Sequence, residues 1–214
     1  MDKIMEFLPF MLEGTVLTVE LFVLTLILSL PLGLPIALGS NSRIKPLSWL
    51  CKIYVWIFRG TPLLLQLFFF YFFFPLVLNI QMNVFFTVVL TYVLNYAAYF
   101  AEIYRSGFQG IPVGQREAAT LLGYGRRHTY FRILFPQMVK RVLPPVTNEV
   151  ITLVKDTSLA YVVSFTEMFY IGQQLSAAQK SLLPLFVAGA FYYVFNFVIA
   201  FIMEKVEKKF NYYQ

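Results

Sequence analysis

Two sets of polar residues stand inside otherwise apolar segments, and each set has the spacing of one helix face. The sets are Glu149, Thr152 and Asp156 in one segment, and Asn95, Tyr99 and Glu102 in the other. Successive members are three or four positions apart, which places each set on one side of a helix. Ionisable groups in apolar segments are costly and so point to a function. Carboxylates hold cations, and hydroxyl and amide groups hold other polar ends, so the two faces predict a pocket for a small polar solute.

The same carboxylates have an alternative role as structural ion-pair partners between helices. The basic residues to consider are Arg59, Arg141 and Lys155 for Glu149 and Asp156, and Arg105 for Glu102. Glu102 and Arg105 are three positions apart, a spacing at which side chains on a helix meet. The sequence leaves both roles open.

The apolar background of these residues indicates an integral membrane protein. Of the 214 residues, 59% are hydrophobic, compared with about 45 to 50% in soluble domains. A membrane span needs about 20 mainly apolar residues. Five segments meet that requirement, near residues 14–38, 55–78, 83–106, 143–169 and 182–203. We therefore expect an all-α protein in which residues 1–214 form a single transmembrane domain.

The placement of basic residues predicts the orientation of these helices. Most of the 17 lysines and arginines lie between the first two predicted spans, between the third and fourth, and in the C-terminal tail. Because cytoplasmic connections are enriched in Lys and Arg, the N-terminus is predicted outside and the C-terminus inside. This arrangement accounts for the net charge of +6 without a nucleic acid partner. The single cysteine excludes an internal disulfide, and the sequence offers no metal motif.

The polar and basic segment 117–136, EAATLLGYGRRHTYFRILFP, connects the third and fourth predicted spans. Its defining positions are Glu117, Ala118, Ala119, Gly123, Ile133 and Pro136. Residues 115–122 favour a helix, the glycines permit a turn, and 126–135 are predicted to form a second short helix before Pro136. Such a pair offers a surface to another protein. The alternative is an ordinary basic amphipathic loop at the membrane surface.

This spacing resembles the EAA loop of the membrane subunits of bacterial ABC importers. The resemblance implies a permease of type I, MetI-like architecture in the bacterial cytoplasmic membrane, with a cytoplasmic coupling-helix loop at about 107–137. It also implies two ATP-binding cassette ATPase subunits, a second permease copy or a sister permease, and an extracytoplasmic binding protein as partners. The chain contains no Gly-x-x-x-x-Gly-Lys-Ser/Thr phosphate loop. We therefore expect that the chain is not an enzyme and holds no cofactor. ATP and Mg²⁺ are expected to be bound by the partner ATPase.

Further motifs resemble the polar amino-acid branch of these importers, at residues 58–67, 97–105, 107–115 and 155–159. In the first, Gly60 and Pro62 interrupt a helix, so we expect a bend that shapes a translocation path. The alternative is a simple helix start at Pro62, with Arg59 reaching to the headgroups. Many members of the branch carry asparagine where this chain has Asp156. The extra carboxylate implies a cationic cargo, namely arginine, lysine or histidine.

Three other features leave alternatives. An ion-coupled secondary transporter could use the same carboxylates with Lys155 as a charge relay, although no second copy of Arg-Gly-Thr-Pro indicates the paired repeats of such carriers. The polar residues 170–181 are predicted to be external, either as a docking site for the binding protein or as a plain loop. Trp49 and Trp56 are predicted at the inner interface, with ordinary packing as the alternative, and His128 as a surface residue.

Overall fold

The computed structural model describes residues 2–210, with side chains described from residue 8 onward. Within this range all the regular secondary structure is helical and no strand occurs, which confirms the all-α class. The α-helices are α1 (Asp2–Ser40), α2 (Lys45–Gly60), α3 (Leu63–Val77), α4 (Val84–Gln109), α5 (Val113–Leu121), α6 (Arg126–His128), α7 (Phe135–Asp156), α8 (Met168–Gln179) and α9 (Leu183–Phe210). A π-helical stretch, η1 (Thr129–Leu134), precedes α7, and a 3₁₀ stretch, η2 (Thr157–Val163), follows it.

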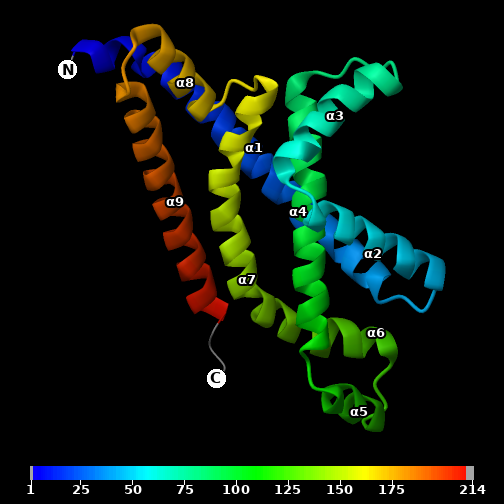
Figure 1. Cartoon of the computed structure of the whole chain (residues 1–214). Helices are drawn as coiled ribbons and strands as arrows, with labels where there is room; N and C mark the ends of the chain where they lie inside the picture. Colours follow the sequence, from blue (N-terminus) through cyan, green and yellow to red (C-terminus); the bar gives the residue numbers. More distant parts are fainter. Residues whose placement is uncertain (1, 211–214) are drawn as a thin grey trace.

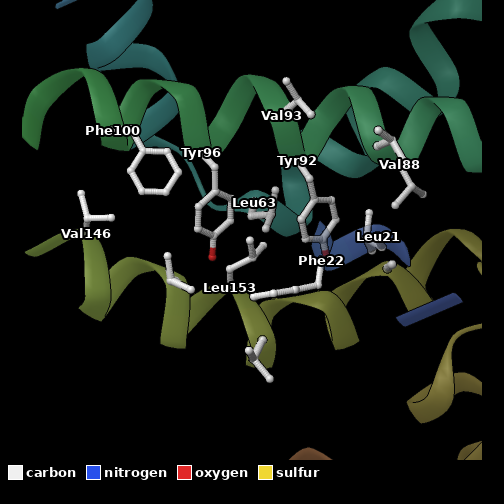
Figure 2. Packing of buried hydrophobic residues seen from close by; sticks show 14 of the residues in the cluster. Leu21, Phe22, Leu63, Val88, Tyr92, Val93, Tyr96, Phe100, Val146 and Leu153 are labelled. Atoms are coloured by element: carbon white, nitrogen blue, oxygen red, sulfur yellow. The ribbon is translucent and has the colours of Figure 1, made fainter. Parts of the chain in front are cut away.

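Helix α4 forms the centre of the fold. Figure 1 shows it upright, with α1 crossing behind it and α7 beside it. Its rings Tyr92, Tyr96 and Phe100 are fully buried or nearly so, and Figure 2 shows them on the side of α4 that faces α7, with Leu153 near the two tyrosines. On α1, Gly33 lets the two helices approach closely, because a Cβ there would lie 2.9 Å from the Cβ of Phe100. The core therefore lies where α1, α4 and α7 meet.

The predicted span at 55–78 is wrong as a continuous helix. Helices α2 and α3 together are apolar and long enough for one span, but they are bent by 110° at their junction. Thr61 has extended backbone, as expected for a residue before proline. Pro62 lacks the N–H that would continue α2, so one helix ends at Gly60 and the next begins at Leu63. The expected bend at this motif is present.

The predicted span at 143–169 is divided as well. Helix α7 ends at Asp156, and the chain turns at Ser164, whose backbone is left-handed with φ of 59°. Glu167 then caps α8, since its carboxylate accepts hydrogen bonds from the backbone N–H groups of Phe169 and Tyr170, each at 2.7 Å. The polar segment 170–181 is therefore largely the helix α8, which packs on α1 and α9.

By length and composition, three helices of residues 2–210 could each cross a membrane, or four if the bent pair counts as one span. The three are residues Leu8–Ser40 of α1, together with α4 and α9. Helix α7 falls outside this set because it carries five charged side chains along its 22 residues: Lys140, Arg141, Glu149, Lys155 and Asp156. The expected count of five spans thus exceeds what helix length and hydropathy support.

The second helix predicted in the polar loop does not end before Pro136. Helix α6, η1 and α7 follow one another without a non-helical residue from Arg126 to Asp156. Pro136 is the second residue of α7 and follows directly on the π-helical stretch, so its missing N–H leaves out one backbone hydrogen bond where η1 changes to α7. The helical segment continues through this proline, and the loop is held directly by α7.

Candidate functional site

A cavity of 330 Å³ lies beside the break between α2 and α3. Helices α4 and α7 form its other walls, and η2 contributes Leu159. Its polar side chains are Asn95, Tyr96 and Tyr99 from α4, Glu149, Thr152 and Asp156 from α7, and Thr61 from the break. All the residues predicted to bind a solute, with the exception of Glu102, thus lie around one cavity, although they come from two helices that are distant in sequence.

Two buried tyrosines of α4 fix the position of Asp156. The hydroxyl of Tyr96 donates to Oδ2 of Asp156 at 2.7 Å, and the hydroxyl of Tyr92 donates to its backbone carbonyl at 2.6 Å. The carboxylate therefore has a defined orientation at the end of α7, where the helix changes to η2. Tyr96 also lines the cavity. The sequence did not lead to a predicted role for Tyr96 in the cavity, although its position next to Asn95 in an otherwise apolar segment could have indicated one.

Gln66 joins the end of α2, the break and α4 through hydrogen bonds. Its Nε2 donates to the carbonyls of Phe58 and Thr61 at 2.9 and 3.0 Å, and to Oγ1 of Thr61 at 2.8 Å. Its Oε1 accepts from Nδ2 of Asn95 at 2.9 Å. Backbone groups freed at membrane depth need such partners. Gln66 is the polar residue in the apolar helix α3, and sequence reasoning assigned it no role.

Glu102 lies outside the cavity and takes part in an ion-pair cluster. Its carboxylate accepts from Nε of Arg105 at 2.8 Å and lies 3.7 Å from the guanidinium of Arg59. The guanidinium of Arg59 also lies over the ring of Tyr99, 5.4 Å from its centroid. Glu102 thus has Arg105 as the structural partner that the sequence spacing indicated. Arg59 is positioned by its contacts with Glu102 and Tyr99.

The cavity carboxylates have no such partners. Within the described side chains, neither Glu149 nor Asp156 has a basic nitrogen within 4 Å. Lys155 is exposed and lies outside the residues that line the cavity. Arg141 lines a neighbouring hollow of 530 Å³ together with Arg59 and Glu102, closer to the loop that follows α4. Two carboxyl groups therefore face a cavity that no basic side chain of the described residues lines.

The predicted loop residues occupy a compact helical unit that projects from one end of the bundle (Figure 1). Glu117 and Ala118 are exposed on α5, whereas Ala119 is 2% exposed and packs inward. Ile133 is half-buried in η1, and Pro136 is exposed in α7. The phenyl ring of Phe108 stacks on Tyr130 with centroids 5.2 Å apart. Burial raises the pKa of Tyr130 to about 12, against the opposing effect of Arg116.

Gly123 ends α5 in a way that requires glycine. Its φ is +74°, in the left-handed region that side chains disfavour. The N–H of Gly123 donates to the carbonyl of Thr120, and the N–H of Tyr124 donates to the carbonyl of Ala119, both at 3.0 Å. These two bonds form the Schellman motif of a helix C-terminus. The loop therefore has one defined shape, and Tyr124 is free to stack on His128 with centroids 4.6 Å apart.

The outer surface of this loop is both apolar and basic. Its exposed apolar side chains are Val113, Leu121, Leu122, Tyr124 and Phe131. Its exposed basic side chains are Arg116, Arg126, Arg127 and Arg132. An exposed apolar patch rimmed by polar groups is typical of a protein interaction site. The helical unit thus offers another protein a preformed surface.

Comparison with known proteins agrees with this architecture. Residues 29–212 match the family described as "Binding-protein-dependent transport system inner membrane component". The chain is 38% identical over 203 residues to the arginine transport system permease protein ArtQ of Bacillus subtilis (strain 168), covering 94% of this chain and 93% of that protein. It is 34% identical over 210 residues to the L-cystine transport system permease protein TcyB of the same organism, covering 97% and 89%. The crystal structure of an amino acid ABC transporter with histidines superposes with a TM-score of 0.89 at 28% identity, covering 97% of each chain.

Proposed function

Because this chain belongs to the family of inner-membrane components of binding-protein-dependent transport systems, we propose that it forms the membrane passage for a basic amino acid. It is a permease of the amino-acid ABC importers with the type I, MetI-like fold, located in the inner membrane. Family membership favours this function over an ion-coupled carrier. Family membership does not specify which amino acid is carried, because similar permeases are named for arginine and for cystine.

The observation that supports a basic cargo is the pair of unneutralised carboxylates in the 330 Å³ cavity. An arginine, lysine or histidine side chain would supply the missing cation to Glu149 and Asp156 and form charge-assisted hydrogen bonds with them. Thr152 and Asn95 would contact the remaining polar groups, and Tyr99 would cover the apolar part of the side chain.

The carboxylate at the other end of an amino acid would bind at the N-terminus of α3, beside the break between α2 and α3. Thr61, Pro62 and Leu63 line the cavity where α3 begins, and no described side chain caps that helix. The N–H groups at a helix N-terminus carry partial positive charge and bind anions. Broken helices use this arrangement for substrate carboxylates in other transporters. The cavity thereby offers opposite charges to the two ends of a basic amino acid.

The loop at about 107–137 is proposed to bind the ATPase subunits through Glu117, Ala118, Ala119, Gly123, Ile133 and Pro136. Its exposed surface supports docking, and its continuity with α7 supports transmission of movement to Glu149 and Asp156. ATP and Mg²⁺ would be bound and used by the ATPase, while a second permease copy or sister permease and an extracytoplasmic binding protein complete the importer. Five spans with the N-terminus outside would place this basic loop in the cytoplasm.

The cargo assignment can be tested by binding of amino acids to the purified chain in lipid nanodiscs. Arginine, lysine and histidine are expected to raise its thermal midpoint, whereas glutamine and glutamate leave it unchanged. Asp156→Asn should abolish the response to arginine. Glu20→Gln, an exposed carboxylate of α1 outside the cavity, is the matched control and should retain the response. Equal responses to arginine and glutamine, or an arginine response that survives Asp156→Asn, would exclude the cationic pocket.

A further inference from the structure

Helix α2 carries an exposed face on which cationic and indole side chains alternate. The residues, called here the α2 ladder, are Lys45, Trp49, Lys52, Trp56 and Arg59. Their steps of four and three positions place all five on one side of the helix. All five are exposed, with 65% of Trp49 and 73% of Trp56 accessible. The buried Ser48 and Val55 lie on the neighbouring side of the helix, so the ladder borders the contact of α2 with the rest of the protein while its two indole rings stay exposed.

The ladder has an excess of positive charge. Arg59 is engaged by Glu102 and Tyr99. Within the described side chains, however, neither Lys45 nor Lys52 has a carboxylate oxygen within 4 Å. A hollow of 270 Å³ runs along the ladder, with walls that include Lys52, Trp56, Arg59 and Arg105. Its acidic member is Glu102, which both arginines already share. The hollow therefore favours an anion.

The surroundings of the ladder point to lipid as the source of that anion. Tryptophan concentrates at the headgroup level of membranes, and helices with basic and indole residues lie in that interface. Basic hollows between helices bind anionic headgroups. Leu50 and Ile57, which are 61% and 55% exposed, lie on the other side of α2 from the ladder, so the helix also offers apolar surface to acyl chains. Lysine is depleted in the cores of protein interfaces, which disfavours a second copy of this chain on the same face.

We propose that the α2 ladder binds an anionic phospholipid. Lys45 and Lys52 hold the phosphate of the headgroup, and the indole rings of Trp49 and Trp56 lie between headgroup and acyl chains. The hollow beside Arg59 accepts the polar part of the headgroup. This site is separate from the solute cavity and depends only on the location of the chain in a membrane.

Intrinsic fluorescence can test this proposal, because Trp49 and Trp56 are the two tryptophans of the chain. The full chain is reconstituted in phosphatidylcholine bilayers that contain an equal mole fraction of either bromine-labelled phosphatidylglycerol or bromine-labelled phosphatidylcholine. The bromine-labelled phosphatidylglycerol is expected to quench the tryptophan fluorescence more strongly than the bromine-labelled phosphatidylcholine does. High salt should reduce this difference between the two lipids. Each lysine near an anionic surface contributes about fivefold to association. The double variant Lys45→Gln with Lys52→Gln should therefore lower the preference of the chain for phosphatidylglycerol over phosphatidylcholine by about 25-fold.

A matched control removes the same charge elsewhere. Lys205→Gln with Lys209→Gln changes two lysines near the end of α9, outside the ladder, and should keep the preference for phosphatidylglycerol. Equal quenching by the two labelled lipids overturns the proposal. Absence of quenching by either lipid also overturns it and indicates a second copy covering the face. A preference abolished by inorganic phosphate at constant ionic strength assigns the site to the free anion instead. The salt and phosphate measurements use the unmodified chain, so they decide the matter even if the double variant fails to insert.

Discussion

Replacing Gln66 with leucine is expected to destabilise the break between α2 and α3 by about 2 kcal/mol. The side chain forms hydrogen bonds with Phe58, with both oxygens of Thr61, and with Asn95. Hydrogen bonds between polar groups within a membrane average about 0.6 kcal/mol, so losing all of them costs about 2 kcal/mol. Leucine has nearly the same size, and Gln66 is 7% exposed, so the change leaves little cavity. For a chain of this length, that loss lowers the thermal midpoint by about 4 to 8 °C.

The measurement is thermal unfolding of the full chain in nanodiscs, with Gln173→Leu as the matched control. Gln173 is exposed on α8, and surface changes of this kind stay within about 0.5 kcal/mol. A double-mutant cycle with Asn95→Leu isolates the contact at 2.9 Å between the two amides. Its coupling energy is expected between about 0.6 and 1.7 kcal/mol. Amino-acid binding should weaken as well, because Asn95 lines the cavity.

Two outcomes would refute this reasoning. If Gln66→Leu unfolds at the same temperature as the unmodified chain, the amide does not hold the break. If the two substitutions are additive in the cycle, Gln66 and Asn95 act independently, and the order of the cavity wall must come from apolar packing alone.

Two further predictions concern glycines. Gly123→Ala forces a side chain into the left-handed region at a cost of about 1 to 2 kcal/mol, and in the assembled importer it should lower uptake per ATP hydrolysed. Gly114→Ala, where an added Cβ meets nothing within 4 Å, should keep the coupling, and equal effects of both would contradict the role of the C-terminal turn of α5. Gly107→Ala places a Cβ 2.2 Å from Cγ1 of Val142, so overpacking should cost about 1 to 3 kcal/mol in thermal unfolding. Addition of Val142→Ala should restore stability; failure to do so would show that α4 and α7 do not depend on this contact.

Helix-face spacing in the sequence identified most of the candidate cavity. Glu149, Thr152 and Asp156 are polar residues at helical intervals in one apolar segment, and Asn95 and Tyr99 in another. A polar side chain in such a segment must face either a polar space or a partner. For Glu102 the spacing already indicated the partner Arg105, but the second partner, Arg59, comes from a different helix and could not be read from the pattern.

The errors in the predicted spans have a common cause. Hydropathy is averaged over a window of residues. The predicted span at 55–78 therefore combined part of α2 with α3 across residues 61–62, and the predicted span at 143–169 combined α7 with the turn that leads to α8. The first boundary depends on Pro62 and the hydrogen bonds of Gln66, and the second on the turn at Ser164 and the cap by Glu167. A window of about 20 residues does not resolve features of that size.

The sequence by itself determined the membrane location, the helical class, the position of the projecting loop and the helix faces that carry charge, because these follow from local composition and from the 3.6-residue period. Tertiary structure alone decided which faces meet. The cavity exists because a 110° bend brings the start of α3 against α4 and α7. No basic side chain lines the cavity beside Glu149 and Asp156, whereas Arg59 contacts Glu102 and Tyr99. Such choices depend on distances between helices that are far apart along the chain, and no local pattern encodes them.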